Sequence, residues 1–167
     1  MKIISILIAL CFVSINTDDI ANSKNCESEL TVEKNRNTRS ADETGTSFRL
    51  VLKNTSSTTQ TYYLSANNAA TTCTNNSKYN QRSAGSKNVS LNVSLETKNS
   101  DHSQRSKLNE ITLNSGQSYS FDVYVSVPKN TPYNTWSCIQ VEAKSKSCGT
   151  LSSKTTLNVY VPDPSEG

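Results

Sequence analysis

The chain has 167 residues, a formal net charge of +3 and only 34% hydrophobic residues. Asparagine, serine and threonine are abundant, with 19, 27 and 19 copies, and this composition excludes a helical bundle or a coiled coil. A single long apolar run excludes a polytopic membrane protein, and the nearly balanced charge predicts no nucleic-acid partner.

The N-terminal segment is typical of a secretory signal peptide. Met1-Lys2 gives a positive start, and residues 3–15 form one apolar run. This run is shorter than the roughly 20 residues that a membrane-spanning helix needs. We therefore expect a signal peptide over residues 1–17, cleaved between 17 and 23, then a polar leader over 18–28 and no membrane span after cleavage. A lipid on Cys11 is the alternative, and Leu10 disfavours it because a small residue is expected there.

Four cysteines remain after signal removal, and an even number in an exported chain predicts two disulfide bonds. They are Cys26, Cys73, Cys138 and Cys148. None forms the close Cys-x-x-Cys pair of a zinc site, and the chain has one histidine, His102. No metal ion or cofactor is expected. The cysteines also predict a secreted or extracytoplasmic location, in a periplasm or at a cell surface.

Alternation of apolar and polar residues with a period of two returns along the chain and predicts β-strands. Turn residues such as Asn54, the run 114–117 and Pro128 separate the strands. Two segments rich in Asn, Ser and Thr, 67–86 and 98–106, are expected to be loops. The expected strands contain residues 30–32, 48–53, 62–64, 91–95, 111–113, 119–127, 139–144 and 157–161.

These strands predict an all-β fold, an antiparallel Ig-like β-sandwich of about seven to eight strands over residues 29–167. A jelly roll or a small barrel is the alternative. The apolar positions of the strands should form the core between the sheets. The expected core side chains are Phe48, Leu50, Leu52, Leu91, Val93, Leu95, Tyr119, Phe121, Val123, Val125, Ile139, Val141, Leu157 and Val159.

Three stretches in the second half of the chain carry a family resemblance. The first stretch, residues 111–128, contains a turn followed by a long expected strand that ends in Val-Pro. The second, residues 130–136, begins with the sequence Asn-Thr-Pro, and the third, residues 141–145, ends with Ala-Lys-Ser. Together with 48–54 in the first half, they resemble a bacterial Ig-like accessory domain, of the fibronectin type III-like kind found beside glycosidases and in cell-surface proteins. The four cysteines and the long segment 67–86 depart from that pattern. The resemblance implies a sandwich fold and no catalytic activity.

The Ig-like topology selects one disulfide pairing among three. The strand containing 62–64 and the strand containing 139–144 are expected to be antiparallel neighbours. Cys73 follows the first and Cys138 begins the second, so both should lie at one end of the sandwich. Cys26 and Cys148 should lie at the other end. We therefore predict Cys73–Cys138 and Cys26–Cys148. A Cys138–Cys148 bond would have to join the ends of one extended strand, roughly 33 Å apart.

The sequence offers no catalytic set, and we predict that the chain is not an enzyme. A serine hydrolase would need a converging histidine base, and His102 lies in a polar stretch. A glycosidase would need two carboxylates across a cleft, and Glu110, Asp122 and Glu142 are expected at outward strand positions or in loops.

Aromatic side chains are the best candidates for ligand contact. Tyr124 and Tyr160 occupy outward strand positions, whereas Tyr133 and Trp136 precede the strand at 139–144. Such rings can anchor a protein partner or stack on a sugar. An alternative is that Trp136 closes the end of the sandwich and the tyrosines cover a sheet face.

These sequence features suggest two alternative functions. The first is an exported non-enzymatic binding or structural module that acts through protein–protein contact, adhesin-like or in a surface assembly, at or near a bacterial cell surface. The second is a stand-alone carbohydrate-binding module that uses the exposed aromatics to bind a glycan.

Overall fold

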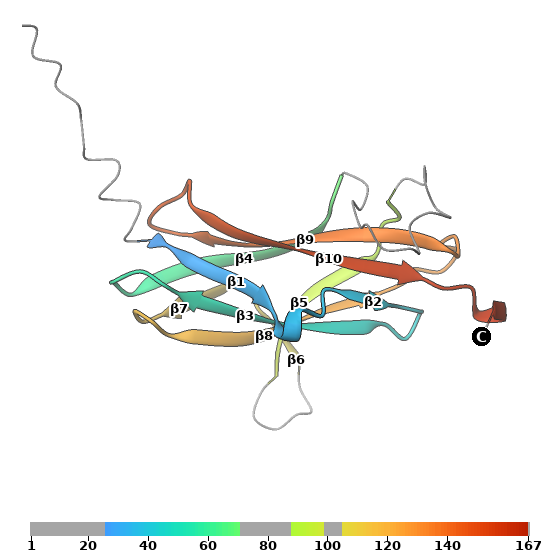
Figure 1. Ribbon diagram of the computed structural model, residues 1–167, viewed down its shortest axis with the longest axis horizontal. Coiled ribbons are helices and arrows are strands. Elements are labelled where there is room, and N and C mark those ends of the chain that lie inside the picture. Colours follow the sequence, from blue (N-terminus) through green and yellow to red (C-terminus); the bar gives the residue numbers. More distant parts are fainter. Residues whose placement is uncertain (1–25, 71–87, 99–104, 167) are drawn as a thin grey trace, which may run out of the picture.

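The computed structural model describes residues 26–70, 88–98 and 105–166. Within them, ten strands form two five-stranded sheets that pack face to face as an Ig-like β-sandwich (Figure 1). The first sheet has, in order, β1 (Ser28–Val32), β3 (Thr46–Asn54), β8 (Ser118–Ser126), β5 (Asn92–Lys98) and β6 (Arg105–Lys107). The second has β2 (Thr38–Ser40), β10 (Ser152–Val161), β9 (Thr135–Ser145), β4 (Gln60–Asn68) and β7 (Glu110–Leu113). The predicted fold class is confirmed.

Each of the eight predicted strands has its counterpart, and two short strands were not predicted. β2 and β6 have three residues each and lie at sheet edges. β2 is fully exposed and pairs in parallel with β10, so main-chain hydrogen bonding forms it without any apolar alternation. β6 and the end of β4 extend into segments that were expected to be loops. The expected signal peptide and most of the expected leader lie outside the described residues.

The core fills the space between the two sheets. Twelve of the fourteen expected core side chains are buried, and the other two, Val93 and Tyr119, are partly buried and pack against the core. The phenol of Tyr119 reaches the edge of the core and forms a 2.7 Å hydrogen bond with the Thr97 hydroxyl. Tyr62, which the sequence placed only in a strand, is completely buried.

β9 organises the second sheet because it has long partners on both sides. It pairs antiparallel with β10 from Thr135↔Val161 to Lys144↔Ser152, and antiparallel with β4. The β4–β9 pairing confirms the expected antiparallel neighbours. β5 pairs with β8, whereas β7 pairs with β4, so the chain changes sheet between β4 and β5 and again between β6 and β7.

A disulfide joins Cys26, just before β1, to Cys148, just after β9, with their Cα atoms 6.1 Å apart. This confirms one predicted pairing and excludes Cys138–Cys148. Cys138 is also disulfide-bonded. Its predicted partner, Cys73, lies outside the described residues, so the Cys73–Cys138 pairing stays a prediction. Among the described residues, no helix is long and apolar enough to cross a membrane.

A buried amide ties three strands together close to this disulfide. Asn54 is completely buried, and its Nδ2 donates to three main-chain carbonyls, among them those of Thr58 and Leu113. Its Oδ1 accepts hydrogen bonds from Ser56 and, at 3.0 Å, from the Tyr62 hydroxyl. Every polar atom of this side chain is therefore satisfied inside the protein. We call the region of Cys26, Asn54, Tyr62 and Cys148 the stapled end.

Candidate binding surface at the open end of the sandwich

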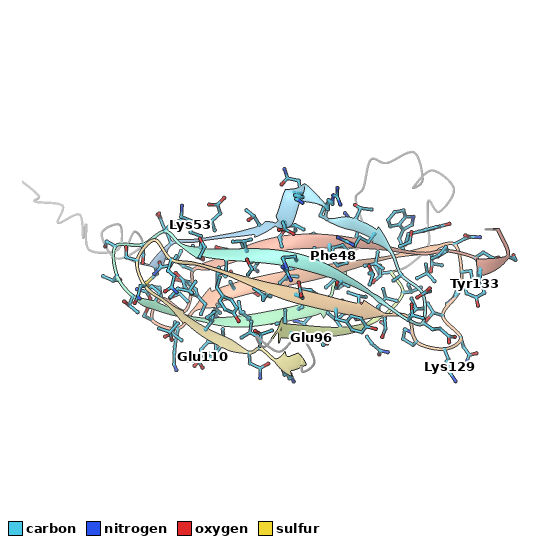
Figure 2. The ribbon with its side chains drawn as sticks, turned by 90° about the horizontal axis from the view of Figure 1, so that it is seen from below. Phe48, Lys53, Glu96, Glu110, Lys129 and Tyr133 are labelled. Carbon is cyan, nitrogen blue, oxygen red and sulfur yellow. A yellow bond between two sulfur atoms is a disulfide. The ribbon has the colours of Figure 1, made fainter. Side chains whose placement is uncertain are left out.

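Three segments meet at the opposite end of the sandwich and surround an open concavity of about 880 Å³. They are the β2–β3 turn, the β8–β9 connection and the chain after β10. Figure 2 shows Tyr133 and Lys129 at this end, and Lys53 and Glu110 at the stapled end. We call residues 42–44, 127–133 and 161–164 the open end.

Four prolines and two valines line the concavity, and both valines also belong to the buried core. The wall contains Val127, Pro128, Pro132, Val161, Pro162 and Pro164. Tyr133 also lines the concavity and is 55% exposed. The only other large hydrophobic residue that is exposed in the described part of the chain is Tyr63, on β4. Proline rings have few conformations to lose on contact, so this wall suits a binding surface.

The β8–β9 connection is fixed by its own hydrogen bonds. Thr131 donates its main-chain N–H and its hydroxyl to the Pro128 carbonyl, at 3.3 and 2.7 Å. The hydroxyl of Thr135 donates to the Pro132 carbonyl at 2.6 Å. Asn134, with φ 56°, adopts the left-handed conformation that asparagine tolerates, and its N–H donates to the Val161 carbonyl at 2.7 Å. Tyr133 therefore extends from a connection that is held at both ends.

The β2–β3 turn is closed by Asp42. Its Oδ1 accepts hydrogen bonds from the Thr44 N–H, the Thr44 hydroxyl and the Gly45 N–H, at 2.9, 2.6 and 3.2 Å. The hydroxyl of Thr44 is the main reason that the pKa of Asp42 lies below its ordinary value. Gly45 has φ 84°, and a Cβ there would lie only 2.8 Å from the Val125 carbonyl oxygen, so this turn requires glycine.

The four aromatic residues singled out in the sequence lie at or beside the open end, in different surroundings. The Tyr124 hydroxyl donates to the Thr44 carbonyl at 2.6 Å, and the Tyr160 hydroxyl donates to Asn134 Oδ1 at 2.6 Å. Both phenols thus hold the connections in place. Trp136 is the cross-strand partner of Tyr160, with ring centroids 5.1 Å apart, and is only 7% exposed.

Trp136 and Tyr160 form a packed pair on the outer face of β9 and β10. The indole N–H of Trp136 is buried and has no hydrogen-bond partner among the described residues. Of the four candidates, Tyr133 is the exposed one, whereas Tyr124 and Tyr160 are partly buried and Trp136 is buried.

Charged side chains at the open end were not singled out in the sequence. Asp42 and Glu43 lie in the β2–β3 turn and Asp163 lies between two prolines that line the concavity, whereas Lys129 lies across from them in the β8–β9 connection. The main-chain N–H of Ser165 holds the pKa of Asp163 below its ordinary value. These positions are far apart in the sequence, so the strand order was needed to bring them together.

The three carboxylates that the sequence placed at outward strand positions or in loops each have an ion-pair partner. Asp122 pairs with Arg49 at 3.0 Å, Glu110 with Lys146 at 3.1 Å, and Glu142 with Lys154 at 3.5 Å. His102 lies outside the described residues. Within the described ranges, no three His, Cys, Asp or Glu side chains are grouped as metal ligands.

A family model described as an Fn3-like domain matches residues 36–147, about two thirds of the chain. The chain belongs to the Fn3-like domain family. This match and the Ig-like fold make it an accessory or binding module, and domains of this family are usually non-catalytic. The resemblance seen in the sequence is therefore confirmed.

No curated protein matches the chain. Solved structures match at the level of fold. They include a family 123 glycoside hydrolase from Clostridium perfringens, with 11% identity over 82% of this chain and TM-score 0.49; the chain spans only 27% of that protein. A FixG-related protein from Vibrio parahaemolyticus has 11% identity over 83% of this chain and 97% of its own, with TM-score 0.45. The periplasmic chaperone SfaE has 10% identity over 82% of this chain and 58% of its own, with TM-score 0.45.

Proposed function

We propose that this chain is an exported, non-enzymatic binding module that acts through protein–protein contact at or near a bacterial cell surface, with the open end as its contact surface. The observation that carries the proposal is Tyr133, an exposed aromatic side chain in a concavity walled by prolines. Exposed aromatic residues in preorganised apolar surroundings are the usual anchors of protein interfaces. The fixed β8–β9 connection reduces the entropy that binding would cost.

Two features support export. Residues 1–17 have the composition of a secretory signal peptide, and the Cys26–Cys148 disulfide belongs to an oxidising compartment. The proposed location is therefore secreted or extracytoplasmic, in a periplasm or at a cell surface.

Site-specific photo-crosslinking tests the contact surface. Tyr133 is replaced by p-benzoylphenylalanine in the full chain, expressed in the source cells and irradiated. Tyr63, which is 44% exposed on β4, is the matched control position. We expect a discrete adduct with an identified protein from position 133 and none from position 63. The purified partner should then bind the unchanged chain, and its affinity for the Tyr133→Ala variant should be at least about tenfold lower. Equal adducts at both positions, or none at 133, would contradict the proposal.

The carbohydrate-binding alternative uses the same exposed ring, because an aromatic face can stack on a sugar. A glycan array separates the two functions. Reproducible hits that disappear in Tyr133→Ala would establish the alternative. An array without such hits, together with a protein adduct from position 133, would support protein contact.

A further inference from the structure

We propose that the open end binds an extended, positively charged, proline-containing peptide segment of the partner protein. This inference rests on the proposed function and adds the chemistry of the occupant. Three properties of the open end lead to it: its charge, its proline and tyrosine wall, and the way in which its carboxylates are held.

The charge at this end is opposite in sign to that of the whole chain. Asp42 and Glu43 line the concavity, and Asp163 lies between Pro162 and Pro164, which also line it. Lys129 is the one lysine among the lining residues, while the chain as a whole carries +3. Within the described residues, none of these three carboxylates forms an ion pair. They are therefore available to a cationic ligand, whose long-range approach they would favour.

The wall of the concavity suits an extended peptide. Peptides rich in proline adopt the polyproline II conformation before they bind, and such peptides dock against exposed aromatic rings. Tyr133 lines the concavity and is 55% exposed, so its ring can take a prolyl ring or a lysine or arginine cation. The volume of about 880 Å³ falls within the range typical of ligand sites.

The turn that Asp42 closes fixes the orientation of its carboxylate but uses only one of the two carboxylate oxygens. All three of its hydrogen bonds go to Oδ1, and Oδ2 has no hydrogen-bond partner among the described residues. The hydrogen bonds from Thr44 to Asp42 and from Ser165 to Asp163 lower the pKa of both groups. These hydrogen bonds favour the charged form of both carboxylates.

Fluorescence anisotropy with three labelled dodecapeptides, alternating Lys-Pro, Gln-Pro and Glu-Pro, tests the charge of the occupant. The purified full chain is titrated at low salt and at high salt. We expect the Lys-Pro peptide to bind about tenfold more tightly than Gln-Pro, the Glu-Pro peptide not to bind, and high salt to weaken the Lys-Pro complex. Equal affinity for the Lys-Pro and Gln-Pro peptides would overturn the inference.

Two variants test whether the Lys-Pro peptide binds at the open end. Glu43→Lys should weaken Lys-Pro binding at least about fivefold, and Tyr133→Ala about tenfold. Glu29→Lys makes the same charge change at an exposed position of β1, near the stapled end, and should leave the affinity unchanged. Loss of affinity in Glu29→Lys equal to that in Glu43→Lys would show non-specific attraction and overturn the inference.

The failure of this inference can be distinguished from failure of the proposed function. If no peptide binds but crosslinking from position 133 still captures one identified protein, the peptide occupant is wrong and the protein-contact function stands. The occupant is then a folded surface. If crosslinking also fails, both are wrong.

Discussion

The two ends of the sandwich are built from the same strands and have opposite chemistry. At the stapled end, a disulfide links the chain covalently, and the Asn54 side chain makes all its hydrogen bonds within the protein. At the open end, carboxylates and the ring of Tyr133 face solvent. On the proposed function, stability and recognition would belong to separate ends of one sandwich. Connections at one end of a sandwich can therefore present a binding surface while the other end secures the fold.

The largest expected effect on stability comes from removing the Cys26–Cys148 disulfide. The double variant Cys26→Ala/Cys148→Ala should lower the free energy of unfolding by about 4–5 kcal/mol, on the chain-entropy account of a long closed loop. Urea denaturation monitored by circular dichroism measures the loss. Peptide affinity at the open end should not change in conditions where the variant is folded. A loss under about 1 kcal/mol would show that the disulfide contributes little to the stability of the fold, and would contradict the role assigned to the stapled end.

The buried amide at the stapled end gives the next effect. Asn54→Asp replaces an amide donor by a carboxylate oxygen that faces three main-chain carbonyls, so we expect a loss of about 3 kcal/mol. Asn92→Asp, at an exposed position of β5, is the matched control and should cost under about 0.5 kcal/mol. Similar losses in both variants by urea denaturation would argue against the Asn54 network.

Two glycines, Gly45 near the open end and Gly116 at the stapled end, allow the local packing of the two ends to be compared by substitution. Both have positive φ, but a Cβ at Gly45 would meet the Val125 carbonyl at 2.8 Å, whereas a Cβ at Gly116 would meet nothing within 4 Å. Gly116→Ala should cost about 1 kcal/mol, and Gly45→Ala about 2–3 kcal/mol. Gly45→Ala should also weaken Lys-Pro peptide binding, because it displaces the turn of Asp42. Equal stability losses in the two variants would contradict the close packing at Gly45.

The smallest effect is a dependence of stability on pH. Hydrogen bonds from Thr44, Ser152 and Ser165 lower the folded-state pKa values of Asp42, Glu142 and Asp163. A lowered carboxyl pKa contributes stability above the unfolded-state pKa, and that stability is lost as the pH falls through the folded-state pKa. The melting temperature should therefore fall below about pH 4.5. Asp42→Asn/Asp163→Asn should flatten this decline, and an unchanged decline would contradict the contribution of the open end.

The period of two in the sequence was sufficient to locate the long strands, because residues such as Phe121 and Val123 must face the core wherever a sheet has one buried side. β2 could not be found in this way, since its three residues are all exposed and carry no alternation, and β6 has only three residues. Asn54 was read only as the end of a strand. Its role depends on the carbonyls of Leu113 and Asn114, at and just after the end of β7 and about sixty residues away, which the sheet order brings to it.

The open end was predictable in part. Tyr133 and Trp136 were identified from their place between strands, and the outward positions of Tyr124 and Tyr160 were read from alternation. The acceptors of the two tyrosine hydroxyls belong to other connections, so their hydrogen bonds had no local signal. Asp42, Glu43 and Asp163 look like ordinary turn residues, and only the strand order brings their connections to the same end of the sandwich.

Amide chemical-shift mapping of the isotope-labelled chain with the Lys-Pro dodecapeptide tests most directly whether recognition belongs to the open end. The account predicts that shift changes are concentrated in residues 42–45, 129–134 and 161–165, and that amides of residues 54–62 and 145–148 do not respond. Changes centred on the stapled end, or spread over the sheet face around Tyr63, would contradict it.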